Sequence, residues 1–324
     1  MSNRATAVIV ADSISPAGIR LTTFQLRYWR PIHSELMTHR VFSRNAGSSR
    51  ARPSKAIIEQ VRNEPWGPIH WGADQAGMQA HQKLTGNAFA MAKMAWMDAA
   101  EGAANMAQQM YEAGAHKQIV NRLLEPFTYI DVLVTATDYA NWFALRDHPD
   151  AQPEIRELAQ LMRAEYNQRI PHEIHMGEWH LPYIDNHDWL AAEKHCQIGR
   201  ITQDIPSYKE KLEIIRKISV ARCARVSYKA FDGTVAPIAK DLALFERLLV
   251  NQPLHASPAE HQATPDDMQW IQRIAVASPE DYDAGDDDEN VLSTDQEWIN
   301  PELHANFTGW KQFRKMLPNE FVPG

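Results

Sequence analysis

The sequence predicts an α+β fold, in which an antiparallel or mixed sheet is flanked by long helices. Residues 5–10 and 21–29 have the composition of strands, and residues 129–137 form a third, β-branched stretch. Between them, residues 87–113 are rich in Ala and Met, which is typical of a long helix. Because no internal repeat and no clear interdomain linker interrupts the chain, we expect residues 1–324 to form a single domain.

The first half of the chain continues this pattern. Residues 31–40 are expected to be helical and to lead into a basic stretch. Residues 53–77 contain several prolines and glycines and two tryptophans, which indicates a long loop. Gly114 is expected to cap the helix over residues 87–113. Five methionines recur along that helix at near-helical spacing and are predicted to form a buried stripe: Met91, Met94, Met97, Met106 and Met110.

The rest of the chain is predicted to be mainly helical. The helix predicted over residues 116–124 is expected to stop before Pro126. Asp150 is expected to cap a helix that tolerates Pro153 in its first turn and runs to Arg169. The other helices are predicted over residues 138–146, 206–217 and 237–250.

Composition places the chain among ordinary globular proteins. Its 324 residues carry 44% hydrophobic and 23% charged side chains, with a formal net charge of −8. There is no apolar run long enough to span a membrane, and the short apolar patch near Met1 lacks the features of a signal peptide. The two cysteines, Cys196 and Cys223, show no metal-ligand spacing. We therefore expect a reduced, cytoplasmic protein with no membrane segment.

Metal sites are not expected from the sequence. The acidic run from Asp281 to Asn290 is predicted to be a solvated, mobile loop rather than a cation site. Four histidines cluster in sequence without a recognised metal pattern: His172, His175, His180 and His187.

The most informative stretch runs from Thr38 to Arg50. It contains one histidine, three arginines, three serines and an asparagine, and it has no acidic residue. From Arg27 to Arg52 there are six arginines against one acid, Glu35, which gives a local balance of +5 on an acidic protein. Arginine forks and serine hydroxyls suit phosphate oxygens. The narrow extent of the basic island favours a small anionic ligand over a nucleic-acid surface.

This stretch resembles the signature of flavin-dependent thymidylate synthases, Arg-His-Arg-x-x-Ser-x-Asn-x-x-Ser-x-Arg. Only the first arginine of the signature differs, because Thr38 stands in its place. The matching positions at the family spacing are His39, Arg40, Ser43, Asn45, Ser48 and Arg50.

Two further segments resemble the same family. Arg122 precedes Pro126 as in Arg-x-x-x-Pro, and Asn141 and Arg146 fit Asn-x-x-x-Leu-Arg, which Ala-Gln-x-Glu-Ile follows at residues 151–155. The later segments are Ala-Arg-Cys-Ala-Arg-Val-Ser at residues 221–227 and His-Ala-Ser-Pro-Ala-Glu-His, which contains His255, Ser257, Glu260 and His261.

The order of these segments differs from that of the family. In the family, Ala-Arg-Val-Ser and the His-x-Ser/Thr-Pro-x-Glu-His segment precede the basic motif, whereas here they follow it. We interpret this as a circular permutation, in which residues 1–171 carry the nucleotide and flavin motif and residues 216–324 carry the part that is N-terminal in the family. The resemblance leaves residues 53–86, 172–205 and 265–297 unexplained.

The resemblance implies reductive methylation of dUMP at C5 to give dTMP. Methylenetetrahydrofolate would supply the carbon, FAD would carry reducing equivalents and NADPH would reduce the flavin. A cysteine nucleophile is not needed, and neither Cys196 nor Cys223 stands in the Pro-Cys-His context of the flavin-independent enzymes. The resemblance also implies a homotetramer with shared active sites.

The family's functional residues can be carried over one by one. Arg146 is implied to stabilise negative charge on the uracil ring and is the predicted catalytic residue. The predicted substrate-binding residues are Glu35, Ser48, Ser49, Arg50, Arg122 and Arg146. The predicted cofactor-binding residues are Thr38, His39, Arg40, Asn45, Asn141, His255, Ser257 and Glu260.

Two departures from the family leave alternatives open. Thr38 replaces an arginine, and Glu35 replaces a glutamine that usually borders the nucleotide. Because glutamate can accept a hydrogen bond from cytosine N4, a variant that acts on dCMP, or one that delivers a hydroxymethyl group, remains an alternative. A non-catalytic nucleotide- or RNA-binding protein is the alternative of another class, although aromatic residues are sparse in the basic stretch.

Overall fold

The computed structural model describes residues 4–198, 204–228, 236–251, 254–274, 292–318 and 320. Its centre is a five-stranded sheet with the strand order β3-β4-β2-β1-β5. All neighbouring strands are antiparallel except β1 and β5, which pair in parallel. The predicted mixed sheet is therefore confirmed. Its strands are β1 (Thr6–Ile14), β2 (Arg20–Trp29), β3 (Ser43–Ala46), β4 (Tyr129–Ala136) and β5 (His172–Glu173).

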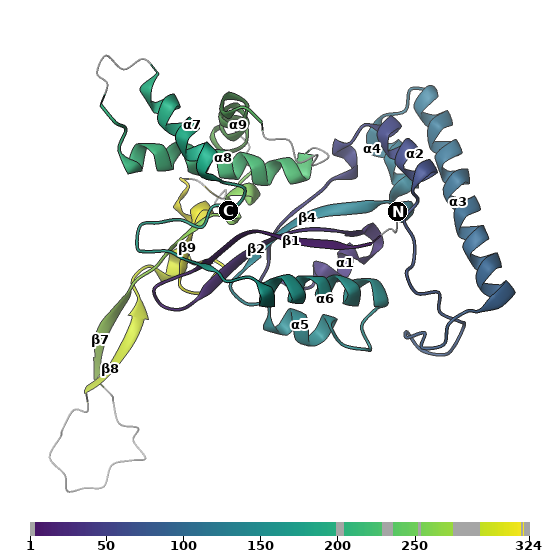
Figure 1. Ribbon diagram of the computed structural model, residues 1–324, viewed down its shortest axis with the longest axis horizontal. Helices are drawn as coiled ribbons and strands as arrows, with labels where there is room; N and C mark the ends of the chain where they lie inside the picture. Colours follow the sequence, from purple (N-terminus) through teal and green to yellow (C-terminus); the bar gives the residue numbers. More distant parts are fainter. Residues whose placement is uncertain are drawn as a thin grey trace, which may run out of the picture.

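The two faces of the sheet are covered by different helices (Figure 1). Alternate residues of β2 and β4, such as Phe24 and Val132, pack with α6 (Pro153–Gln168) in the main hydrophobic core. On the opposite face, Leu133 packs with Cys223 and Val226 of α8 (Tyr208–Tyr228). A helix from the second half of the chain therefore completes a sheet that the first half forms.

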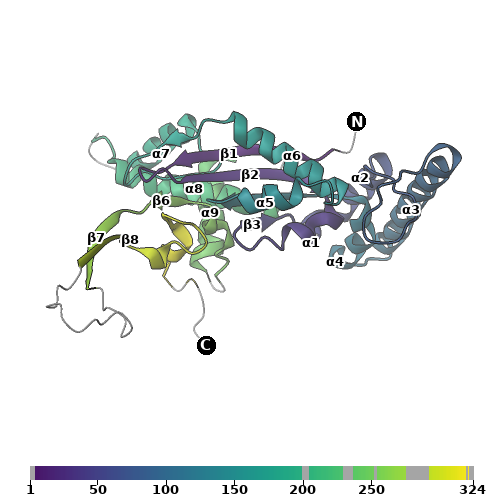
Figure 2. The ribbon, with the colours of Figure 1, turned by 90° about the horizontal axis from the view of Figure 1, so that it is seen from below.

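A helical unit lies at one end of the sheet. It comprises α2 (Ser54–Asn63), α3 (Gly86–Glu112), α4 (Lys117–Val120) and the 3₁₀ helix η3 (Asn121–Phe127). Figures 1 and 2 both place this unit at the end of the molecule opposite the hairpin of β7 (Met268–Ile274) and β8 (Leu292–Trp298).

The long helix α3 matches its predicted bounds, but its buried face differs from the prediction. Small residues face α2 and η3, and Ala100, Ala104 and Ala107 are buried there. Alanine allows close approach of neighbouring helices, so the bulkier methionines lie elsewhere on the helix. Of the predicted core stripe, only Met110 packs against this cluster. The exposed fraction is 64% for Met91 and Met94, 43% for Met97 and 50% for Met106. The prediction of a buried stripe was wrong for these four.

Several other boundaries differ from the sequence prediction. Instead of a helix over residues 31–40, a 3₁₀ turn (η1, Arg30–Ile32) leads into the single turn α1 (His33–Leu36). The chain then turns so that it can enter β3. The helix expected to end before Pro126 continues as η3 through that proline. The helix expected from Asp150 begins as α6 with Gln152 as its N-cap.

The second half of the chain contains three more helices in its described part. They are α7 (Asn186–Gln197), α8 and α9 (Ile238–Phe245), and α9 continues as the π-helical turn η4 (Glu246–Val250). The predicted helix over residues 206–217 therefore extends to Tyr228. A buried ion-pair network joins these helices, because Arg222 contacts Asp188 at 2.6 Å and Asp241 at 3.3 Å.

The last elements are short. They are the 3₁₀ turns η5 (Ser257–Glu260), η6 (Pro301–Leu303) and η7 (Phe313–Met316), the paired strands β6 (Ala263–Pro265) and β9 (Trp310–Gln312), and the hairpin of β7 (Met268–Ile274) and β8 (Leu292–Trp298). The predicted acidic loop, Asp281 to Asn290, lies outside the described residues. Within the described part of the chain, no helix has the length and apolarity needed to cross a membrane.

Candidate functional site

Three side chains surround the guanidinium of Arg146, the last residue of α5 (Ala140–Arg146). Arg146 Nη1 donates to Glu35 Oε2 at 2.9 Å, and Nη2 donates to Thr38 Oγ1 at 3.2 Å. Its Nε donates to His39 Nε2 at 3.2 Å. The structure therefore brings four of the predicted site residues together in one cluster, which includes Thr38 and Glu35, the two positions at which the chain was noted to depart from the family.

His39 is held in place by aromatic side chains. Its ring stacks on Phe42, with centroids 5.6 Å apart, and meets the edge of Trp142 at 4.8 Å. Burial lowers the pKa of His39, and the charges of Arg146 and Arg44 lower it further. The imidazole is therefore neutral near pH 7, so Nε2 can accept the hydrogen bond from Arg146.

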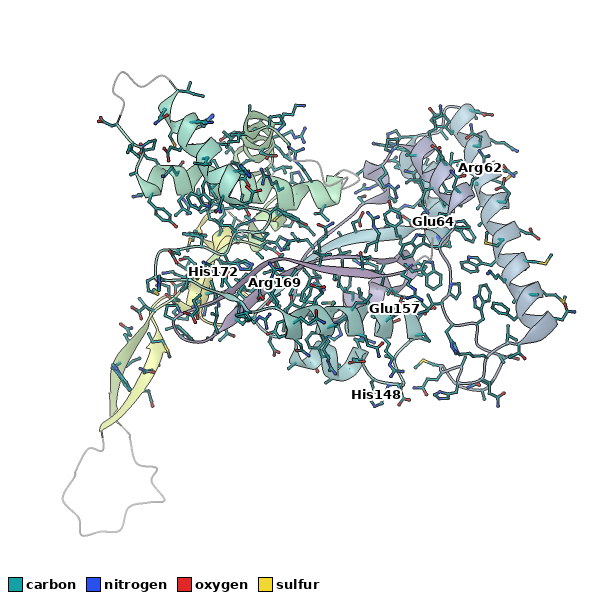
Figure 3. All side chains as sticks on the ribbon, in the orientation of Figure 1. Arg62, Glu64, His148, Glu157, Arg169 and His172 are labelled. Carbon is teal, nitrogen blue, oxygen red and sulfur yellow. The ribbon has the colours of Figure 1, made fainter. Side chains whose placement is uncertain are left out.

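A groove of about 1140 Å³ opens beside Arg146. One wall is the loop over residues 68–83, and the other is the start of α6, where Glu157 is labelled in Figure 3. The backbone N–H of Ile69 donates to Glu154 Oε1 at 2.9 Å, which links the loop to α6. The groove is thus defined by two fixed elements, and Glu35 and Arg146 lie on its lining.

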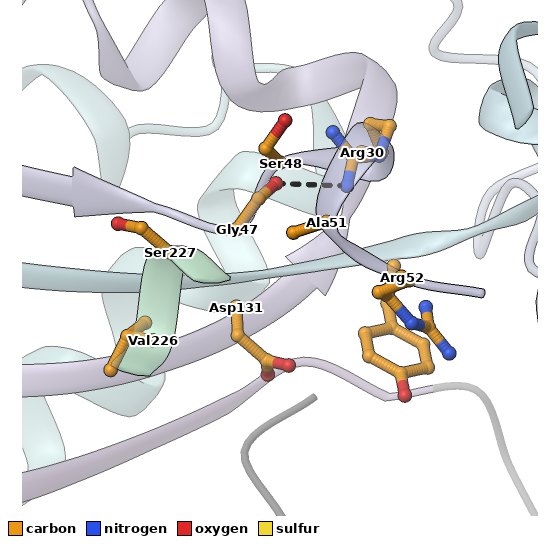
Figure 4. A pocket seen from close by; sticks show the side chains of 9 residues that line it. Arg30, Gly47, Ser48, Ala51, Arg52, Asp131, Val226 and Ser227 are labelled. Atoms are coloured by element: carbon orange, nitrogen blue, oxygen red, sulfur yellow. Dashed lines mark hydrogen bonds between the residues drawn. The ribbon is translucent and has the colours of Figure 1, made fainter. Parts of the chain in front are cut away.

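A second cluster surrounds Ser48 (Figure 4). Arg30 Nη2 donates to the carbonyl of Gly47 at 3.1 Å, and the backbone N–H of Ser48 donates to the carbonyl of Ser227 at 3.2 Å. The guanidinium of Arg52 lies over the ring of Tyr129, 5.1 Å from its centroid. The small pocket between these groups has a volume of about 10 Å³, enough for a water-sized group.

Arg30 is the most unusual residue of this second cluster. Its Nε is buried and has no hydrogen-bond partner among the described residues. Burial lowers the pKa of Arg30, although an arginine stays charged at neutral pH. A buried donor without a partner is costly, so this atom is suited to an acceptor from a ligand or water. Arg30 and Arg52 were not predicted as site residues, although both belong to the basic run from Arg27 to Arg52.

A third cluster forms a pocket of about 440 Å³ beside residues 40–44 of the basic stretch. Arg40, Phe42, Ser43 and Arg44 form one wall, and Glu260 comes from η5. Residues from the end of the chain complete the lining: Ala305, Asn306, Gln312, Arg314, Lys315 and Glu320.

The remaining predicted site residues are more dispersed. Asn45 is buried, and its Nδ2 donates to the carbonyl of Cys223 at 3.4 Å. The carbonyl of Ser49 accepts from Asn121 Nδ2 at 2.8 Å. Arg122 is exposed and pairs with Glu125 at 2.8 Å. The structure leaves four others exposed, outside the three clusters: Arg50, Asn141, His255 and Ser257.

The late segments of the chain pack against the basic stretch and its neighbouring strand. Besides the contact between Asn45 and Cys223, Thr135 of β4 and His261 Nδ1 lie 2.8 Å apart. His261 is fully buried, and it directly follows η5, which carries Glu260. Segments separated by roughly half of the chain therefore contribute to the same region of the molecule.

Among the described residues, metal-ligating side chains do not converge in this region. Over the residues that the structure describes, no three His, Cys, Asp or Glu side chains are grouped so that they could hold a metal ion.

Comparisons with known proteins identify the family. No curated protein matches the chain. Two crystal structures of the UMP/dUMP methylase PolB from Streptomyces cacaoi are similar, one bound with 5-Br UMP and the other with 5-Br dUMP. They are 17% and 18% identical, with TM-scores of 0.41 and 0.44. Each match covers 52% of this chain, and 90% and 91% of the respective PolB chain.

The family model described as thymidylate synthase complementing protein matches residues 13–172, which include the basic stretch, Arg122 and Arg146. Residues 13–172 therefore match the thymidylate synthase complementing protein family, that of the flavin-dependent thymidylate synthases, as the motif of the basic stretch indicated.

Proposed function

We propose that this protein methylates dUMP at C5 to give dTMP, with methylenetetrahydrofolate as the carbon donor and with FAD reduced by NADPH. The observation that carries the proposal is the cluster around Arg146. A guanidinium held by three side chains is a fixed cation at the edge of a groove. Fixed charges stabilise developing charge better than mobile ones, because they need no reorganisation during the reaction.

In this proposal, Arg146 faces the carbonyl edge of the uracil ring. Negative charge that develops on the ring is stabilised there, and C5 becomes more nucleophilic. His39 and Thr38 hold the guanidinium without opposing its charge, since both are neutral. Glu35 also holds it, but its carboxylate partly offsets the positive charge.

The serine-rich part of the basic stretch is proposed to hold the nucleotide phosphate and sugar. Ser48, Ser49 and Arg50 were predicted for this role together with Arg122. The buried and unpartnered Nε of Arg30 and the nearby Arg52 add two cations beside Ser48, which supports this assignment.

The third cluster fits the phosphate-bearing part of FAD. It is a pocket with two arginines of the basic stretch, Arg40 and Arg44, and it has an aromatic side chain, Phe42. When bound, FAD would carry the reducing equivalents of the reaction. We retain Thr38, His39, Asn45, Asn141, His255, Ser257 and Glu260 as further proposed contacts of the cofactor.

We also propose that the active form is a homotetramer with sites shared between subunits. The exposed methionines of α3 support this proposal, because four large apolar side chains on one helix are typical of a surface that another protein covers. Size-exclusion chromatography with light scattering tests it. A protein that is monomeric at micromolar concentration, with or without ligands, would contradict it.

Circular permutation is proposed to explain the order of the segments. The packing of α8 and η5 against β3 and β4 supports it. A chain in which residues 204–320 are joined ahead of residue 4 by a flexible linker should fold and bind the same nucleotide. Loss of folding over a series of linker lengths would contradict the proposal.

The main proposal is tested by the release of tritium from C5 of labelled dUMP, in the presence of methylenetetrahydrofolate, NADPH and FAD. Release that depends on all three co-reactants supports methylation. The corresponding assay with dCMP tests the alternative that Glu35 suggests, since its carboxylate could accept from the amino group at C4. Absence of release from either nucleotide would contradict a C5-modifying enzyme.

A further inference from the structure

The pocket beside Arg40 has a wall that the family model does not cover. The family model ends at residue 172, whereas the wall is formed by lining residues between 305 and 316 together with Glu320. Two side chains of this wall reach Ser43, a fixed position of the basic motif. Asn306 Oδ1 accepts from Ser43 Oγ at 3.2 Å, and Gln312 Nε2 donates to the same Ser43 oxygen at 3.2 Å. The wall therefore positions a motif residue directly.

This wall is held firmly in place. Asp266 accepts hydrogen bonds from the backbone and the side chain of Asn300, each at 2.8 Å, and lies 2.9 Å from His304 Nε2. The fully buried ring of Trp310 anchors β9. Between these anchors, Ala305 has a φ of 53°, a conformation that non-glycine residues adopt only when their surroundings enforce it. The wall is thus a fixed part of the pocket.

Positively charged side chains outnumber negatively charged ones around the pocket. Four cations, Arg40, Arg44, Arg314 and Lys315, face two acids, Glu260 and Glu320. Arg314 pairs with both acids, and Lys315 pairs with Glu320. Arg314 and Lys315 are therefore already engaged in ion pairs with acidic residues of the protein.

The cations of the basic stretch are left facing the pocket. Arg44 donates only to backbone carbonyls, of Met37 at 2.8 Å and His39 at 3.3 Å, in the part of the chain that the structure describes. Arg40 is exposed, and no ion pair involves it among the same residues. With both acids neutralised by the wall, the pocket presents a net positive charge to a ligand.

We propose that residues 305–316 form one wall of the site for the diphosphate group of a dinucleotide cofactor, and that Arg314 is a positioning residue that neutralises Glu260 beside Arg40 and Arg44. This inference rests on the proposed flavin-dependent function and extends its site to a segment outside the family match. Without Arg314, the partly buried carboxylate of Glu260 would repel the diphosphate that the two arginines attract.

Binding of FAD by the purified full-length chain, measured from the flavin's fluorescence, tests the inference without any need for turnover. Arg314→Gln is expected to weaken FAD binding about tenfold, and Arg314→Lys to stay within about threefold of the unchanged protein. Arg163→Gln is the matched control. It removes the same charge from α6, where Arg163 pairs with Asp147 at 2.8 Å and lies outside the pocket lining, and it should leave FAD binding unchanged.

The double variant Arg314→Gln/Glu260→Gln distinguishes the effect of an unpaired carboxylate from an effect of poor folding. It leaves no unpaired carboxylate and is expected to bind FAD within about threefold of the unchanged protein, even if the single variant folds poorly. Unchanged FAD affinity in Arg314→Gln, or a double variant as weak as the single one, would overturn the inference.

Binding of dUMP, measured by calorimetry, distinguishes this inference from the proposed function. Arg314→Gln should bind dUMP as the unchanged protein does, because Arg314 lies in neither of the other two clusters. If the unchanged protein binds both FAD and dUMP but Arg314→Gln binds FAD equally well, only the inference fails. If the unchanged protein binds neither ligand, the proposed function fails, and the inference fails with it.

Discussion

The carboxylate of Glu35 accepts a hydrogen bond from the guanidinium of Arg146 at 2.9 Å, and both side chains are largely shielded from solvent. The two residues are 111 positions apart and come from α1 and α5. A carboxylate at this position fixes the guanidinium and at the same time reduces the positive charge that it offers to a ligand. A substitution at Glu35 should therefore change how strongly Arg146 stabilises negative charge on a bound ligand.

The first prediction concerns this adjustment. Glu35→Gln keeps a hydrogen-bond acceptor for Arg146 but removes the opposing charge, so the rate of tritium release from dUMP is expected to rise about threefold to tenfold. Glu35→Ala removes the contact as well and should lower the rate. Steady-state kinetics of both variants with dUMP and dCMP provide the measurement. A lower rate with dUMP in Glu35→Gln would show that the carboxylate itself is needed.

The second prediction concerns Arg146. Arg146→Ala should lower the rate of tritium release about 100-fold or more, as expected when a fixed donor that stabilises developing charge is lost. Arg163→Ala is the matched control. Arg163, whose side chain is more exposed than that of Arg146, pairs with Asp147 at 2.8 Å, so its removal should change the rate little. Equal losses in the two variants would indicate a structural role for Arg146 rather than a role in catalysis.

The third prediction concerns the close approach at Gly47. A Cβ atom there would lie 3.1 Å from the carbonyl oxygen of Asp131 and 3.5 Å from that of Val226. Gly47→Ala should therefore shift β3 away from its neighbours, destabilise the fold by about 1 kcal/mol and weaken dUMP binding at Ser48. Thermal unfolding and calorimetry with dUMP measure the two effects.

Gly102→Ala is the control for that variant. Gly102 lies within α3, and a Cβ atom there would meet nothing within 4 Å. The substitution should stabilise the helix by about 0.5–1 kcal/mol, because alanine has the higher helix propensity. If Gly47→Ala were as stable as Gly102→Ala and bound dUMP equally well, the close approach at Gly47 would not be needed for the fold or for binding at Ser48.

Local patterns predicted several elements of the fold. The strands β2 and β4 and the helix α3 were found from composition and spacing, because these signals are contained within each segment. The methionines of α3 were misplaced because spacing shows that side chains share a face, but not whether that face is the buried one. Here the alanines of the same helix were small enough to pack against α2.

The candidate site could also be predicted only in part from the sequence. The motif of the basic stretch identified Thr38 and His39, and the Asn-x-x-x-Leu-Arg segment identified Arg146, since a family signature records which distant residues meet. It could not identify Asn306 or Gln312, which contact Ser43 across 263 and 269 positions of sequence. No local pattern indicates a contact of that range. Arg30 was also missed, because its role depends on its burial rather than on its position in the motif.

The last prediction concerns pH and two buried histidines. His180 lies 2.8 Å from Thr23, which contacts Thr135, and Thr135 contacts His261. Burial lowers the pKa of each histidine from 6.5 to about 3, so both are neutral in the folded protein above that pH. The unfolded chain binds more protons between pH 6.5 and 3, and the free energy of unfolding should therefore fall by about 1.4 kcal/mol per pH unit for each histidine as the pH drops through this range. Urea unfolding at pH 7.5, 6 and 5 measures the slope. His261→Gln should remove the contribution of one histidine, about 1.4 kcal/mol per pH unit, and a slope unchanged by this variant would contradict the assignment.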